Sequence, residues 1–249
     1  MLFEASVKNV TEWKAILNAI SDVVDEAMFI CNQDGITFRG IDPAHVALLD
    51  VTIPKPSFES FSCTATFFGI KIDDFKSVIN AAATDDTIKL QIENPNKMDI
   101  FVQGTLTMQF SINLIEKSEV NTPLPKVEVK SRISLSPNVL TKIITNIERV
   151  SEHVIINSIP EKIQFIGKGD VGNAKVVLEK NNPDLSLLEV MENSSSMYSL
   201  EYMAKIIRDI GKACNNVNME YGTKTPLYMS FEMPSMTKVE YYLAPRIED

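Results

Sequence analysis

Cysteine is scarce in this sequence. Its three cysteines, Cys31, Cys63 and Cys214, are far apart and form no C-x-x-C pair. An odd and scattered set is typical neither of a disulfide framework nor of a zinc cluster, so we predict reduced, intracellular thiols and no metal site. Long apolar runs are also missing, since no stretch approaches the roughly 18 residues that span a bilayer. The N-terminus MLFEASVKNV lacks the order of a signal peptide. We expect a soluble protein with no membrane partner.

Cations are outnumbered by acids. The chain has 24 Lys and Arg against 33 Asp and Glu, a formal charge of -9 and a pI near 4.9. This average is unusual for a nucleic-acid-binding protein, whose domains tend to be basic. Hydrophobic residues make up 45% and charged residues 23% of the 249, which is typical of a globular protein with one large or two modest domains.

Signatures of catalysis are largely missing. No G-x-S-x-G or Walker sequence occurs, and neither His45 nor His153 has a partner at metal-ligand spacing. The segment 167–172 matches G-x-G-x-x-G, but a dinucleotide site needs a helix to begin there. The following residues, 173–179, alternate like a strand, so we predict a hairpin turn. Asp73-Asp74 and Asp85-Asp86 fit a helix start and a turn better than an acid/base pair. We expect no enzymatic activity and no cofactor.

An internal repeat divides the chain in two. At an offset of 127, Leu17 falls on Ile144, Phe29 on Ile156 and Phe38 on Phe165, while 75–79 falls on 203–207 at an offset of 128. Two copies of one supersecondary unit are therefore predicted. Between them lies the polar segment 116–126, which ends in Pro-Leu-Pro-Lys and disfavours helix and central strand. The predicted domains are 1–115 and 129–249, joined by a connector at 116–128.

Each half combines two helices with several strands. Helical periodicity covers about 11–21, 73–83, 137–149 and 199–213, and Ser136-Pro137 predicts a helix start. Strand alternation is clear in five segments: 36–39, 88–92, 108–112, 175–179 and 239–243. Many short strands with few helices predict an α+β fold built on antiparallel sheets.

Charge is distributed unevenly along the chain. The four predicted helices hold seven of the 24 cations and six of the 33 acids, which leaves 17 cations and 27 acids elsewhere. Because the apolar stripe of each helix faces a sheet, its cations should project to the opposite side. Exposed lysines also serve solubility, so this pattern gains meaning only if the four helices face the same way.

The C-terminal residues 239–248, VEYYLAPRIE, closely resemble the ending of proliferating cell nuclear antigen, the sliding clamp of eukaryotes and archaea. The segments 1–5 (MLFEA), 42–48 (DPAHVAL), 167–173 (GKGDVGN) and 225–227 (TPL) also follow this family in order and spacing. The resemblance covers the whole chain. It implies a ring of three subunits in which twelve helices line a hole around duplex DNA and sheets form the outside.

A ring of this kind explains the charge pattern, because helix cations would meet phosphates without reading bases. By helix position and resemblance together, we expect six residues to face DNA: Lys14, Lys142, Arg149, Lys205, Arg208 and Lys212. Ser21, Ser77, Asn80 and Thr145 occupy places where eukaryotic members carry cations, which predicts a less basic lining.

The resemblance also implies a hydrophobic pocket for Q-x-x-[aliphatic]-x-x-[aromatic]-[aromatic] peptides of DNA polymerase, the clamp loader, flap endonuclease and DNA ligase. Its expected residues are Ile41, His45, Val46, Leu48, Val120, Leu124, Pro226, Tyr242, Ala244, Pro245 and Ile247. About half of the side chains around Tyr242 would in any case point into the protein core, because side chains alternate between the two faces of a strand.

Subunits are expected to join head to tail through two edge strands. The expected residues are Met108, Phe110 and Ile112 on one subunit and Lys175, Val176 and Leu178 on the next. The sequence leaves open a homotrimer or part of a heterotrimer. Two other classes also stay open, an enzyme that uses the loop 167–172 and a generic interaction module. A short connector without a basic cluster indicates an archaeal clamp at the nucleoid in the cytoplasm, or a nuclear one if the source is eukaryotic.

Overall fold

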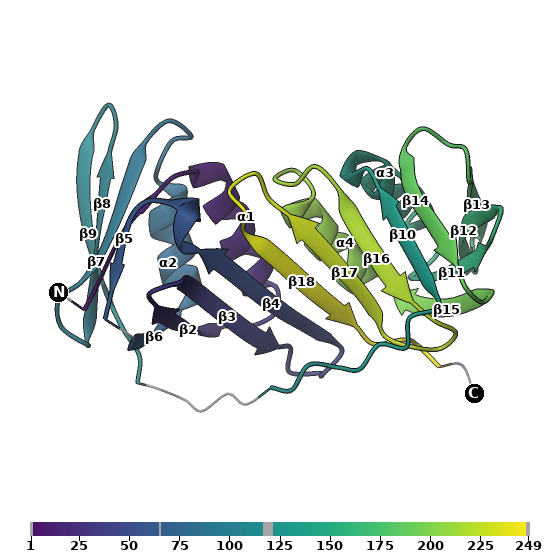
Figure 1. The fold of residues 1–249 in the computed structure, drawn as a ribbon, viewed down its shortest axis with the longest axis horizontal. Helices are drawn as coiled ribbons and strands as arrows, with labels where there is room; N and C mark the ends of the chain where they lie inside the picture. The colour runs from purple at the N-terminus through teal and green to yellow at the C-terminus, as the bar shows by residue number, and fades with distance from the viewer. Residues whose placement is uncertain (1, 65, 117–121, 248–249) are drawn as a thin grey trace. The chain divides into compact units, whose positions relative to one another are not determined.

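The computed structural model describes residues 2–64, 66–116 and 122–247. The first half of the described chain contains β1 (Phe3–Val7), α1 (Val10–Ser21), β2 (Glu26–Asn32), β3 (Gly35–Ile41), β4 (Ala47–Pro54), η1 (Lys55–Ser57), β5 (Phe58–Cys63), β6 (Thr66–Lys71), α2 (Ile72–Asn80), β7 (Thr87–Ile92), β8 (Lys97–Gln103) and β9 (Thr107–Asn113). The second half contains β10 (Ser131–Leu135), α3 (Pro137–Ile147), β11 (His153–Ile159), β12 (Lys162–Gly169), β13 (Gly172–Glu179), β14 (Leu185–Val190), β15 (Ser194–Ser199), α4 (Leu200–Ile210), β16 (Val217–Tyr221), β17 (Leu227–Glu232) and β18 (Lys238–Leu243). The two halves repeat the same order of helices and strands (Figure 1).

The chain forms two compact units. The first comprises Met1–Pro43, Leu49–Thr122 and Met233–Val239, and the second comprises Ala44–Leu48, Pro123–Glu232 and Glu240–Asp249. Each unit therefore includes a short segment from the other half of the sequence. No helix in the described part of the chain is both long and apolar enough to cross a membrane.

Both units use the same antiparallel strand order. The first unit has a sheet in the order β5-β1-β7-β8-β9, and the second unit has the matching order β14-β10-β16-β17. The other sheet runs β6-β2-β3 in the first unit and β15-β11-β12-β13 in the second. The predicted α+β fold with two tandem repeats is confirmed, and the five predicted strand segments all lie within strands.

The helices cover the sheets in pairs. The pair α1 and α2 lies behind β2, β3 and β4 in Figure 1, and α3 packs on α4 in the second unit. The apolar stripe of each helix is buried, as at Leu17, Phe75, Leu140 and Ile207. Burying each such side chain contributes about 1.5–3 kcal/mol to folding. The helical periodicity of the sequence therefore indicated the correct packing face.

The helix ends differ from the prediction. Asn9 caps α1, because its side chain accepts a hydrogen bond from the Glu12 N–H at 3.1 Å and donates to the Glu12 carboxylate at 2.9 Å. Ser136 occupies the predicted N-cap of α3 but makes no side-chain capping bond. The helices α3 and α4 end at Ile147 and Ile210. Arg149 and Lys212 therefore lie just after their helices rather than within them.

Candidate functional site

The exposed side of α3 and α4 carries a row of cations. Lys142 lies on α3 and Arg149 just after it, while Lys205 and Arg208 lie on α4 and Lys212 just after it, at spacings of three and four residues. Residues three and four apart lie on one side of a helix. Five of the six cations predicted to face DNA thus lie on or directly after α3 and α4, all within the second unit. We call these five residues the cation row.

Two members of the cation row are held by carboxylates. Lys205 Nζ lies 2.9 Å from Glu201 Oε1 and 5.9 Å from the centre of the Tyr202 ring, and Arg208 pairs with Glu148 of α3. Among the described residues, Lys142, Arg149 and Lys212 are exposed and form no ion pair. The row therefore presents three unpaired and two partly neutralised charges.

The helices of the first unit carry fewer available cations than the cation row. Lys14 Nζ donates hydrogen bonds to the carbonyl oxygens of Ala82 at 2.6 Å and Asn80 at 3.3 Å, so it neutralises the C-terminal end of α2. Lys76 Nζ donates to Ser21 Oγ at 2.8 Å and lies 3.7 Å from Asp73. Glu12 is only 3% exposed, and its carboxylate accepts a hydrogen bond from the Asn9 side chain. Lys14 was predicted to face DNA, but its ammonium is already engaged by backbone carbonyls.

β9 and β13, the two strands predicted at the subunit contact, are both end strands of their sheets in the described chain. β9 ends the sheet β5-β1-β7-β8-β9, and β13 ends the sheet β13-β12-β11-β15. Met108, Phe110 and Ile112 are half-buried on one side of β9. On β13, Val176 is half-buried and Leu178 is buried, whereas Lys175 is exposed. Both strands predicted at the subunit contact are thus sheet edges, and their contact between subunits stays a prediction.

The segments predicted to hold partner peptides meet in the second unit. Ala244 N–H donates to the carbonyl oxygen of Val46 at 2.8 Å, which joins the C-terminal tail to the segment that contains His45 and Leu48. Leu48 is buried, whereas His45 is exposed with a left-handed φ of 58°. Leu124 is 42% exposed and Ile247 65% exposed, which leaves apolar surface at the connector and the tail.

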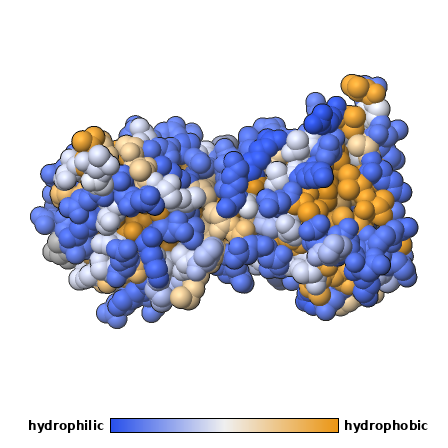
Figure 2. Space-filling view, turned by 90° about the horizontal axis from the view of Figure 1, so that it is seen from above, coloured by the Kyte–Doolittle hydropathy of each residue, from blue (hydrophilic) through white to orange (hydrophobic). Residues whose placement is uncertain are grey.

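The rest of the predicted pocket falls in several places. Pro226, Tyr242 and Pro245 are half-buried in the second unit. Ile41 ends β3 in the first unit, and Val120 lies outside the described residues. The surface drawn in Figure 2 is largely hydrophilic and is broken by a few hydrophobic patches.

Tyr228 lies beside Tyr242, and the sequence did not predict this contact. The two ring centres lie 5.1 Å apart, and the Tyr228 hydroxyl donates to Glu240 Oε1 at 2.5 Å. Burial, followed by the nearby Glu240 carboxylate, raises the pKa of Tyr228. The ring of Tyr242 is therefore held from one side by a neutral phenol. Strand alternation in 227–232 was the only signal that could have suggested Tyr228 as a neighbour.

The glycine motif forms a turn, as predicted. β12 and β13 pair as an antiparallel hairpin in which Gly169 lies opposite Gly172. A Cβ atom at Gly169 would lie 1.9 Å from the Val150 carbonyl oxygen, and Gly172 has a φ of +152°. Close approach and positive φ both require glycine here. A strand follows the motif where a dinucleotide site would need a helix.

Comparison with known families decides between the remaining classes. The family model of the N-terminal domain of proliferating cell nuclear antigen (PCNA) matches residues 2–117, and the model of the C-terminal domain matches residues 123–246. The chain belongs to the PCNA family. The resemblance seen in the sequence is thereby confirmed over both halves.

Relatives and solved structures agree with this assignment. A DNA polymerase sliding clamp of Cenarchaeum symbiosum is 36% identical over 248 residues, covering 99% of each chain. Another, of Nitrosopumilus maritimus, is 34% identical over 249 residues, covering 100% of each chain. A PCNA crystal structure from Thermococcus kodakaraensis has a TM-score of 0.93 at 24% identity, covering 98% of this chain and 100% of that one. A chain from the PCNA2-PCNA3 complex of Sulfolobus tokodaii has a TM-score of 0.90 at 25% identity, with 98% and 100% covered.

Proposed function

We propose that this protein is a DNA sliding clamp, a non-enzymatic ring that encircles duplex DNA and confers processivity on a replicative DNA polymerase. The observation that carries the proposal is the cation row on α3 and α4, within a chain whose formal charge is -9. Such a surface attracts phosphates without base contacts, which permits movement along DNA. The remaining acidic surface disfavours binding of DNA anywhere else.

Ring closure is proposed to use the two sheet edges. β9 has its counterpart in β18 and β13 has its counterpart in β4, counted along the two halves. Within the second unit, Ala244 directly after β18 already hydrogen-bonds to Val46 just before β4. An equivalent contact from β9 of one subunit to β13 of the next would be heterologous, and three such contacts close a ring when the rotation permits.

Partner enzymes are proposed to bind beside the C-terminal tail. DNA polymerase, the clamp loader, flap endonuclease and DNA ligase would each insert apolar anchors of a short peptide at His45, Val46, Pro226 and Tyr242. Anchor side chains that fill a pocket supply most of the binding energy in such interfaces. A clamp of this kind would act at the nucleoid in the cytoplasm of an archaeal cell.

Light scattering and primer extension test the proposal together. A mass of three times 27.8 kDa is expected for the purified protein, and longer products are expected when it is added to a replicative polymerase on a singly primed circle. A Phe110→Asp variant, with its charge on the edge strand β9, serves as the negative control. It should abolish both the trimer mass and the longer products. A monomer at every concentration would point to missing heteromeric partners. A trimer that never lengthens products would refute the clamp function.

A further inference from the structure

A small cationic cavity lies between two segments of the proposed peptide pocket. It has a volume of about 280 Å³ and is lined by Ile155, Ser195, Ser196, Met197, Lys224 and Arg246. Lys224 lies two residues before Pro226, and Arg246 lies between Pro245 and Ile247. Every lining residue belongs to the second unit. We call this cavity the tail notch.

The lining of the tail notch combines two half-buried apolar side chains with two exposed cations. Ile155 and Met197 are cross-strand partners on β11 and β15, and both are half-buried. Lys224 and Arg246 are exposed, and neither forms an ion pair with any described residue. The lining includes two cations and no carboxylate.

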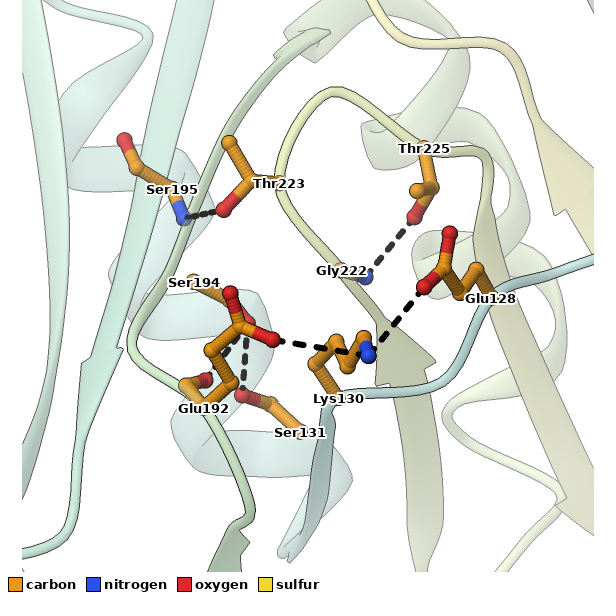
Figure 3. Close-up of polar contacts among 9 residues, drawn as sticks. All are labelled: Glu128, Lys130, Ser131, Glu192, Ser194, Ser195, Gly222, Thr223 and Thr225. Carbon is orange, nitrogen blue, oxygen red and sulfur yellow. Dashed lines mark hydrogen bonds and ion pairs between the residues drawn. The ribbon is translucent and has the colours of Figure 1, made fainter.

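The turn that carries Lys224 is held at several points (Figure 3). Gly222 N–H donates to Thr225 Oγ1 at 2.7 Å, and Ser195 N–H donates to Thr223 Oγ1 at 3.2 Å. Lys224 N–H donates to the carbonyl oxygen of Ser195 at 3.3 Å. Its φ of 56° lies in the left-handed region, which is unfavourable for lysine and is maintained only where surrounding contacts impose it.

The position of Arg246 beside the tail notch is fixed by a backbone hydrogen bond of the C-terminal tail. Arg246 N–H donates to the carbonyl oxygen of Met197 at 2.7 Å, as an isolated antiparallel bridge on β15. Arg246 also borders a second cavity, which contains Glu148, Glu152 and Glu201. No ion pair in the described chain joins it to any of them. The guanidinium charge is therefore available to a ligand.

From these contacts we infer that the tail notch binds a carboxylate side chain, Asp or Glu, that flanks the apolar anchors of a partner peptide. The inference rests on the proposed partner pocket and specifies the chemistry of the peptide beside it. A carboxylate placed between an ammonium and a guanidinium accepts charge-assisted hydrogen bonds from both. Its aliphatic stem would lie over Ile155 and Met197. On the acidic surface elsewhere, the same residue would be repelled.

Peptide binding measured by fluorescence anisotropy at 50 mM salt tests the inference. Two peptides of the form Q-x-x-[aliphatic]-x-x-[aromatic]-[aromatic] carry three Glu residues either before or after the motif, and each has a matched version with Gln in place of Glu. One acidic flank should bind about three- to tenfold more tightly than its Gln version, as expected for exposed pairs with two cations. The other acidic flank should bind more weakly, because it faces an acidic surface.

Variants assign the preference to the tail notch. The double substitution Lys224→Gln with Arg246→Gln should abolish the acidic preference and leave the Gln peptides unchanged. Lys8→Gln is the matched control, because Lys8 is exposed, lies in the first unit and belongs to no proposed site. Two results would overturn the inference: no flank preference in the wild type, or a preference that survives the double substitution. Loss of duplex binding in the double variant, with the peptide preference intact, would assign the two cations to DNA instead. If none of the four peptides binds, the proposed pocket itself fails.

Discussion

Replacing Lys212 by Gln removes one unpaired cation from each subunit of the proposed ring, and three from the ring. Each phosphate contact contributes about 0.9 to the slope of log K against log salt. The slope should therefore fall by about 0.9 if one copy contacts phosphate at a time and by about 2.7 if all three do. Between 50 and 200 mM salt, one contact changes affinity about 3.5-fold. The change is large enough to measure.

The assay is fluorescence anisotropy of a labelled duplex at several salt concentrations, with Lys8→Gln as the control for net charge. Lys8 lies in the first unit and outside the cation row. The control should keep the wild-type slope, because Lys8 belongs to no proposed phosphate contact and the slope depends on the number of such contacts. An unchanged slope in Lys212→Gln would show that this end of the row does not contact DNA.

The ion pairs allow a prediction of opposite sign. Glu148 holds Arg208, and its side chain is 26% exposed. A Glu148→Gln substitution should free the guanidinium for phosphate and remove a repelling carboxylate, so duplex affinity and the salt slope should both rise. A fall in affinity would mean that Glu148 positions Arg208 for DNA instead of competing with it.

Three further predictions concern the interface, the connector and a thiol. Phe110→Asp should convert the proposed trimer to a species of 27.8 kDa by light scattering, because it places a charge on the edge of β9; a trimer would exclude this edge. A Cβ atom at Gly222 would lie 2.6 Å from the Glu128 carbonyl oxygen, so Gly222→Ala should destabilise folding by about 1–3 kcal/mol in denaturant unfolding, and an unchanged midpoint would contradict it. Burial raises the pKa of Cys214 to about 11, so its thiol stays protonated at neutral pH. Its alkylation rate, followed by peptide mass spectrometry, should rise about tenfold per pH unit from pH 8 to 10 because the thiolate is the reactive form, and a rate that levels off near pH 9 would refute the shift.

Periodicity in the sequence was sufficient for the fold because it reports which side of each element is buried. The offset that aligns Leu17 with Ile144 also aligns the strands of the first half with those of the second, and the two units share one strand order. The glycine motif was interpretable for a similar reason, since alternation after Gly172 excluded a helix. Edge strands were predicted through the family resemblance, and periodicity alone would not have distinguished β9 or β13 from a central strand.

Side-chain partners could not be predicted, because they depend on contacts far apart in sequence. Lys14 bonds to carbonyls 66 and 68 residues away, and Arg208 pairs with a carboxylate 60 residues away. A helical wheel places both residues on an exposed side but cannot say that one is engaged by a helix end. The left-handed turn at Lys224 was equally hidden, since nothing in Gly-Thr-Lys-Thr-Pro specifies which residue adopts positive φ.

The ion pairs within the cation row are consistent with a surface that must slide. In the proposed ring, five cations per subunit would give fifteen, and a protein with six to ten phosphate contacts already loses about 10³ to 10⁵ in affinity between 50 and 200 mM salt. Binding of that strength at low salt would hold the ring at one place on the duplex. Glu201 and Glu148 partly neutralise Lys205 and Arg208, whereas Lys142, Arg149 and Lys212 form no ion pair within the described part of the chain. Topological closure can then retain the ring while each phosphate contact stays weak enough to exchange.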